Sequence, residues 1–208
     1  QHRVTARMGD GFFVVVALGD SLTAGYRTLD PYAVDPRVPY PAQLEALLRE
    51  RLGGRVQAFV VNAGVNGDST EGMLWRFGRV VVAERPDAVV VWGGINDLGA
   101  ARDPEQVMAN LVRLYSLCGG INARPVACTL TPTRRTSPNM RRLNELIRAH
   151  AHEKGVTLAD LFPALSDEEG NLRGEYSDDG VHLTPVGYGR VAETVLESLK
   201  PLIEDMEP

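Results

Sequence analysis

The sequence predicts an α/β fold: a three-layer α/β/α sandwich with a five-stranded parallel sheet, of the flavodoxin-like type. Short apolar runs alternate with amphipathic segments along the chain, which is the pattern of βαβ units. Most of these runs are β-branched and apolar throughout, as in strands of a parallel sheet that helices cover on both faces. No repeat or linker divides the sequence, so we expect a single domain over residues 8–208.

The apolar runs are the predicted strands. They lie at residues 12–18, 56–61, 88–92, 126–130 and 156–159. In a parallel sheet of this kind, ligands bind in a crevice outside the carboxyl ends of the strands. The residues that directly follow each strand are therefore the first candidates for chemistry.

The segments between the strands carry signals for the starts and ends of helices. One apolar stripe is expected to end at Gly53-Gly54, and it consists of Leu44, Leu47, Leu48 and Leu52. Asp68 and Glu71 have the spacing of a capping box, which predicts that Asp68 opens the next helix.

Three further helices are predicted where a capping residue precedes proline. These openings are Asp103-Pro104, Ser137-Pro138 and Thr184-Pro185. We expect the first of these helices to end before Gly119-Gly120 and the second to end near Gly155.

Composition excludes several classes of protein. The chain has 208 residues and a net charge of −5, with a sequence pI near 5.4. This acidic balance argues against a nucleic-acid partner. The longest fully apolar run, residues 12–18, is far shorter than the roughly 20 residues of a membrane-spanning helix, so no integral membrane segment is expected. The oligomeric state is not predicted.

Residues 1–7 precede Met8 and match no known pattern, so we interpret them as an N-terminal extension, an expression remnant or a mature terminus left after processing. Cys118 and Cys128 are too few for a disulfide framework, and two free thiols are expected, although the two could bridge each other. Free cysteines and the lack of an apolar leader favour a cytoplasmic location, an argument that a removed signal peptide would cancel.

Polar residues of complementary chemistry follow the predicted strands. Ser21 follows the first strand, Gly64 the second and Asn96 the third, while Asp179 and His182 lie in the long loop after the fifth. A hydroxyl, a glycine, an amide and a carboxylate–imidazole pair are the components of an acyl-transfer site. The sequence therefore predicts that they meet at one edge of the sheet.

Each of these residues also has a structural interpretation. Ser21 could be a helix cap, and as a nucleophile it needs a base, which His182 could supply. His182 could be a surface residue beside a helix start. Asp179, three residues before it, could orient its ring, and Asp178 is the rival for this role.

The two candidate oxyanion donors are equally ambiguous when taken alone. Gly64 could be a turn glycine or could bring a backbone N–H close to the substrate. Asn96 could be a turn residue or a side-chain N–H donor. We expect Asp97 to be structural, holding its loop through backbone hydrogen bonds.

These blocks, in this chain order, resemble the SGNH hydrolase family, also called GDSL esterases/lipases. They read GDSLTAGY from Gly19, NAGVNGDS around Gly64, Gly-Ile-Asn-Asp ending at Asp97, and Asp-x-x-His from Asp179 to His182. The resemblance implies one catalytic domain with Ser21 as nucleophile, His182 as base and Asp179 as its orienter. It further implies oxyanion donors at the Ser21 N–H, the Gly64 N–H and the Asn96 side chain, and ester or thioester hydrolysis without a metal or other cofactor.

Other templates fail on the residues. The α/β-hydrolase elbow needs Gly-x-Ser-x-Gly, and Thr23 stands at its last position. The chain has no Walker loop, Rossmann glycine motif, Cys-x-x-Cys or His-Glu-x-x-His. His150 and His152 lie two apart on a predicted helix and face different sides, so they are poor joint ligands.

The expected partner is a small-molecule ester. The loop at 26–41 is either a surface loop or a wall of the substrate site. A basic cluster is either a solvated face or a site that favours an anionic group of the substrate or a lipid surface. The cluster comprises Arg134, Arg135, Arg141 and Arg142. No long insertion could form a deep lid, so we predict an open groove for short or medium acyl esters. Carbohydrate deacetylase and thioesterase or lysophospholipase activity remain alternatives, and a non-catalytic module for a small anion is a rival of another class.

Overall fold

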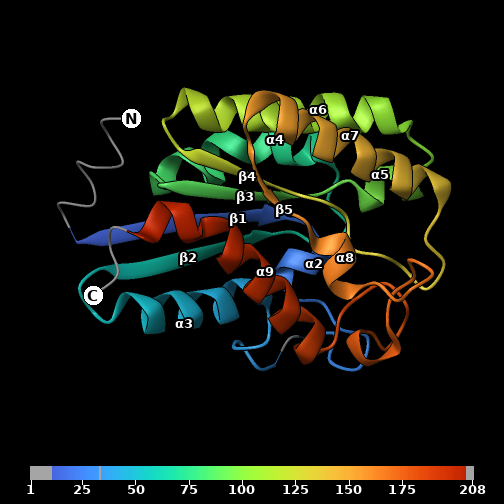
Figure 1. Cartoon of the computed structure of the whole chain (residues 1–208), viewed down its shortest axis with the longest axis horizontal. Helices are drawn as coiled ribbons and strands as arrows, with labels where there is room; N and C mark the ends of the chain where they lie inside the picture. The colour runs from blue at the N-terminus through green and yellow to red at the C-terminus, as the bar shows by residue number, and fades with distance from the viewer. Residues whose placement is uncertain (1–10, 33, 205–208) are drawn as a thin grey trace.

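The computed structural model describes residues 11–32 and 34–204 (Figure 1). Its sheet has five parallel strands in the order β2-β1-β3-β4-β5. They are β1 (Phe12–Gly19), β2 (Gln57–Gly64), β3 (Ala88–Trp92), β4 (Arg124–Cys128) and β5 (Thr157–Ala159). This order confirms the predicted flavodoxin-like class. Residues 1–7 lie outside the described residues, and the single domain over 8–208 stays a prediction.

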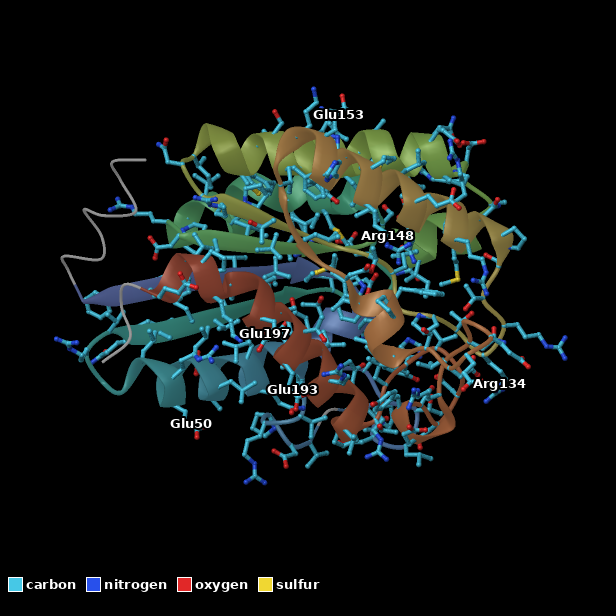
Figure 2. The ribbon with its side chains drawn as sticks, in the orientation of Figure 1. Glu50, Arg134, Arg148, Glu153, Glu193 and Glu197 are labelled. Atoms are coloured by element: carbon cyan, nitrogen blue, oxygen red, sulfur yellow. The ribbon has the colours of Figure 1, made fainter. Side chains whose placement is uncertain are left out.

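Helices cover both faces of the sheet. Figure 1 shows α3 (Tyr40–Leu52) and α9 (Pro185–Ile203) on one face, and α4 (Thr70–Val80), α6 (Pro104–Gly120) and α7 (Pro138–Lys154) on the other. Short helices lie near the strand ends: α2 (Ser21–Ala24), α5 (Ile95–Gly99) and α8 (Leu161–Leu165), with the 3₁₀ turns Val82–Glu84 and Gly174–Tyr176. Figure 2 shows Glu50 on α3 and Glu193 and Glu197 on α9 at the outer surface, which leaves the apolar sides of these helices to the core.

The burial of each strand follows its place in the sheet. All five residues of the central β3 are buried, as expected of a strand that is covered on both faces.

β4 begins two residues earlier than predicted and ends at Cys128. The Asn144 side chain accepts from Leu130 N–H at 2.7 Å and donates to Leu130 O at 3.1 Å, so the backbone of Leu130 bonds to this amide instead of a neighbouring strand.

The helix caps confirm most of the predicted openings. Asp103, Ser137 and Thr184 each accept a backbone N–H of the first turn. The predicted cap at Asp68 is wrong, because the Ser69 hydroxyl accepts from Gly72 N–H while the Asp68 carboxylate binds an arginine.

The predicted ends of two helices have different outcomes. The helix over 104–120 includes both glycines, and the left-handed residue that follows it is Asn122, at φ 58°. The expected stop before Gly119 is therefore wrong. The stop at Gly155 is confirmed, because this residue is the left-handed cap of α7.

Side chains of α3 protect the outer edge of β2. Glu45 Oε2 accepts from Val60 N–H at 2.9 Å, and Arg49 Nε donates to Ala58 O at 3.0 Å. The two side chains also form an ion pair at 3.2 Å. Backbone groups that an edge strand would otherwise present to another strand are thereby satisfied within the chain.

Candidate active site

Ser21 begins α2 directly after β1 and thus stands at the carboxyl end of the sheet. The Asp20 carboxylate caps this short helix by accepting from Leu22 N–H at 2.9 Å, and Gly25 ends it at φ 92°. Ser21 is only 8% exposed. The turn thus fixes the backbone of Ser21 on both sides.

Ser21, His182 and Asp179 form one chain of hydrogen bonds. Ser21 Oγ lies 3.1 Å from His182 Nε2, and His182 Nδ1 lies 2.8 Å from Asp179 Oδ2. A carboxylate can only accept, so it selects the ring form with the proton on Nδ1. His182 Nε2 is then free to accept the hydroxyl proton of Ser21.

The Asp179 carboxylate is held by five donors, the most distant of which is the Ser177 hydroxyl at 3.5 Å from Oδ1. Its Oδ1 accepts the backbone N–H groups of Val181 at 2.8 Å and His182 at 2.7 Å. Its Oδ2 accepts from the His182 ring and, at 2.5 Å, from the Thr28 hydroxyl. Burial favours the neutral carboxyl, but the hydrogen bonds from Thr28, His182 and the backbone outweigh it and hold the pKa of Asp179 well below its usual range.

Asp178, the rival orienter, has a different partner. Its Oδ2 accepts from Arg27 Nε at 2.9 Å, in an ion pair whose side chains are about one quarter exposed. The sequence favours Asp179 over the adjacent Asp178 for this role, and of the two only Asp179 contacts the His182 ring.

Gly64 lies against the serine turn. It is the register partner of Gly19, and a Cβ at Gly64 would come within 2.2 Å of the Ala24 nitrogen. Its N–H donates to Asn62 Oδ1 at 2.9 Å, and Asn62 Nδ2 donates to Thr23 O at 3.0 Å. Asn62, which the sequence analysis did not single out, therefore joins the second block to the first.

Asn96 is tied to the second block through Asp68. Asn96 Nδ2 donates to Asp68 O at 2.9 Å, and an amide nitrogen carries a second N–H. Neighbouring Asp97 accepts the Thr70 N–H at 3.0 Å and the Thr70 hydroxyl at 2.7 Å, which agrees with its expected structural role. The predicted donor role of Asn96, like that of Gly64, stays a prediction.

Arg76 is a buried charge that supports these turns and was not predicted from the sequence. Arg76 Nε donates to Asp68 Oδ2 at 2.8 Å, and its Nη2 donates to Gly19 O at 2.9 Å. Burial raises the pKa of Asp20 to about 7, and the carboxylates of Asp68 and Asp97 add to this rise while the Leu22 N–H opposes it.

The predicted basic cluster divides into two parts. Arg141 donates to Glu169 O, and Arg142 pairs with Glu105 at 3.0 Å, so both are bound on the surface of α7. Arg134 N–H donates to Gly180 O at 2.8 Å, and Figure 2 shows Arg134 beside the loop that follows α8. Arg134 is thus placed against the loop that holds His182, and Arg135 is an exposed residue beside it in the sequence.

The loop over 26–41 contacts the loop of His182 near its start and is exposed further along, and its role as a wall of the substrate site stays a prediction. Arg27 and Thr28 contact the loop of His182, whereas Leu29, Tyr32 and Val34 are 70%, 89% and 77% exposed.

Cys118 and Cys128 are free and buried, and burial raises the pKa of the Cys118 thiol to about 12.

Residues 11–32 and 34–204 contain no cluster of three or more His, Cys, Asp or Glu residues suited to a metal ion. Within the same ranges no helix has the length and apolar character needed to cross a membrane.

Comparison with known proteins places this geometry in context. A family model described as GDSL-like Lipase/Acylhydrolase matches residues 17–190. Esterase TesA of Pseudomonas aeruginosa is 27% identical over 159 residues, 76% of this chain and 78% of that protein. Thioesterase 1/protease 1/lysophospholipase L1 of Escherichia coli K12 is 29% identical over 194 residues, 91% of this chain and 84% of that protein.

Solved structures show the same fold. A lipolytic protein of the G-D-S-L family from Desulfitobacterium hafniense DCB-2 superposes with a TM-score of 0.77 at 22% identity. The match covers 89% of this chain and 99% of that one.

Proposed function

The chain belongs to the GDSL-like lipase/acylhydrolase family, and from this premise we propose that it hydrolyses carboxylic esters through an acyl-enzyme on Ser21. Membership supports esterase or acylhydrolase chemistry, and the serine step is our finer proposal. One observation carries it: the chain of hydrogen bonds from Ser21 through His182 to Asp179. Such a chain activates an alcohol that is otherwise a weak nucleophile.

Acylation begins when Ser21 Oγ attacks the ester carbon and its proton passes to His182 Nε2. The new C–O bond pushes an electron pair onto the carbonyl oxygen. Asp179 stabilises the imidazolium without taking its proton. When the tetrahedral intermediate collapses, the ester C–O bond breaks and His182 returns the proton to the departing alcohol.

The developing oxyanion needs N–H donors. The Ser21 N–H lies in the first turn of a helix, where such groups have no intrahelical acceptor. The second N–H of the Asn96 amide and the Gly64 N–H complete the proposed set, with Gly64 sharing its hydrogen between Asn62 and the oxyanion. Each donor of this kind is typically worth about 10²–10³ in turnover. Water activated by His182 then attacks the acyl carbon and releases Ser21.

We propose short or medium acyl esters as substrates. In support, the described residues between β1 and β2 form no helix besides α2 and α3 that could cover Ser21, and 8% of Ser21 is exposed. Thioester or lysophospholipid hydrolysis at the same site is the second candidate, because the named activities of the Escherichia coli relative include both. All of these reactions require the same attack by serine on an acyl carbon.

A covalent serine reagent tests the proposal directly. A fluorophosphonate should modify the wild-type protein once, at Ser21 in the peptide map, and should leave Ser21→Ala unmodified. Ser21→Ala should also lose p-nitrophenyl acetate hydrolysis while keeping its thermal unfolding midpoint. Ser198→Ala is a control for loss of a hydroxyl elsewhere, because the Ser198 hydroxyl donates to Val195 O of its own helix. Full activity in Ser21→Ala would overturn the serine step, whereas an unreactive and inactive wild type would favour the non-catalytic module.

Acyl preference is measured on a series of esters and thioesters. We expect the best kcat/KM for p-nitrophenyl esters with acetyl to hexanoyl groups. An optimum at long chains would contradict the open groove, and a strong preference for thioesters would favour the second candidate.

A further inference from the structure

Three consecutive residues, 26–28, connect the turn of Ser21 to the loop of His182. Tyr26 packs its ring edge on the His182 ring, with centroids 4.5 Å apart at 62°. Arg27 pairs with Asp178 at 2.9 Å, and the Thr28 hydroxyl donates to Asp179 at 2.5 Å. Each residue of this segment, which we call the strap, thus contacts a different residue of the loop that carries the proposed base.

The strap is fixed at its origin to Ser21 itself. The N–H groups of Gly25 and Tyr26 both donate to Ser21 O at 2.9 Å. From the side of α9, the Tyr188 hydroxyl donates to Tyr26 O. The strap therefore links the backbone of Ser21 to the carboxylate of Asp179, two groups that are 158 positions apart in the sequence.

The Thr28 hydroxyl binds the same oxygen of Asp179, Oδ2, that accepts from the His182 ring. Asp179 Oδ2 accepts the Nδ1 proton of His182, and the Thr28 hydroxyl occupies the second lone pair of this same oxygen. The backbone N–H groups of Val181 and His182 bind Oδ1. With donors on both oxygens, the carboxylate cannot turn without breaking a charge-assisted hydrogen bond.

We propose that Thr28 is a positioning residue, which holds Asp179 so that the His182 ring presents Nε2 to Ser21. This inference rests on the proposed function above. A hydrogen bond to the orienting group acts on the transition state rather than on substrate binding, because the substrate does not touch it. Loss of the hydroxyl should therefore lower kcat and leave KM nearly unchanged.

The test compares Thr28→Val, which removes the hydroxyl at equal volume, with Thr28→Ser, which keeps it. Thr194→Val is the matched control, because the Thr194 hydroxyl bonds only to Arg190 O of its own helix. With p-nitrophenyl acetate we expect kcat to fall about tenfold in Thr28→Val, as is usual for partners that orient a functional side chain. KM should change by less than about twofold. Thr28→Ser and Thr194→Val should match the wild type.

A second readout does not depend on turnover. The proton between His182 Nδ1 and Asp179 gives a downfield resonance in the one-dimensional proton NMR spectrum, which His182→Ala identifies by its loss. This resonance should shift or broaden in Thr28→Val and remain as in the wild type in Thr28→Ser. Thr28 is exposed, so the unfolding midpoint should move by less than about 2 °C in both variants.

The outcomes separate the two proposals. Wild-type kcat and an unchanged resonance in Thr28→Val would overturn the role of Thr28, and so would a loss in Thr28→Ser as large as that in Thr28→Val. An inactive wild type in which Thr28→Val still alters the resonance would overturn the esterase proposal and leave the positioning contact supported.

Discussion

Arg76 and Asp68 form a buried ion pair that joins two sides of the candidate site. Their side chains are 9% and 13% exposed, and Arg76 Nε lies 2.8 Å from Asp68 Oδ2. The same guanidinium binds Gly19 O beside the serine turn, while Asp68 O accepts from Asn96. One pair of charges therefore holds the end of β1 and the third sequence block in a fixed relation.

Replacement of Arg76 by methionine should strongly destabilise the fold. The change leaves the Asp68 carboxylate buried without its partner, and breaking a buried pair in this way typically costs about 3–5 kcal/mol. Urea unfolding measures this loss. Arg79→Met is the matched control, because Arg79 is an exposed residue of the same helix and its loss should cost less than about 0.5 kcal/mol. Equal stabilities of the two variants would contradict the proposed tie.

Asn substitutions of the two adjacent aspartates should have very different effects on turnover. Asp179→Asn replaces the acceptor-only carboxylate with an amide that can also donate to the His182 ring, so the ring form is no longer selected and kcat should fall by roughly four orders of magnitude. Asp178→Asn weakens only the pair with Arg27, so its kcat should stay within about tenfold of the wild type. Steady-state kinetics decides between them, and similar losses in both would show that the orienter is misassigned.

Gly64→Ala should impair both activity and stability. Its new Cβ would lie 2.2 Å from the Ala24 nitrogen and 2.8 Å from Asp20 O, so the serine turn would have to move. We expect kcat to fall at least about 10²-fold, because small misplacements at a reacting centre are costly. Gly78→Ala is the control, since open space surrounds that Cβ in α4 and the change should stabilise the helix by about 0.5–1 kcal/mol. An active Gly64→Ala would remove the argument for close packing there.

Asp20→Asn should change how stability depends on pH. The pKa of Asp20 is about 7 in the folded protein and near 3.8 when unperturbed, so between these values the folded state holds the proton more tightly. This contribution to the free energy of unfolding is therefore complete below about pH 4 and is lost as pH rises to about 7. Asn cannot ionise and keeps an acceptor for the Leu22 N–H.

Relative to wild type, Asp20→Asn should thus gain roughly 3 kcal/mol of stability between pH 5 and pH 8. Urea unfolding at the two pH values measures this gain. A difference between variant and wild type that stays constant with pH would contradict the raised pKa.

The sequence was sufficient to predict features that depend on local patterns. Ser21 lies just beyond β1 and Gly64 is the last residue of β2, and their convergence was predictable because all strands of a parallel sheet end at the same edge. The end of β4 was not predictable, because the Asn144 amide that binds Leu130 comes from a different element. The predicted cap at Asp68 failed for a similar reason: Asp68 has a cap's chemistry, but Arg76 binds its carboxylate and Ser69 caps the helix instead.

Contacts between distant segments account for what sequence reasoning missed in the site. Thr28 lies in a loop 151 residues before Asp179 and has no motif of its own. Arg76 looks like an ordinary charged residue of a helix, and only the packing of α4 over Gly19 makes its charge necessary. The Asp-x-x-His spacing, by contrast, placed carboxylate and imidazole within one turn of chain, so this pairing was predictable.

The side chains that cover β2 have a consequence for how the molecule behaves at high concentration. With Val60 N–H and Ala58 O already bound by Glu45 and Arg49, an incoming strand from a second copy would first have to displace an ion pair. Self-association by extension of the sheet at β2 is thereby opposed, because side chains of α3 already bind the exposed backbone groups of this edge strand.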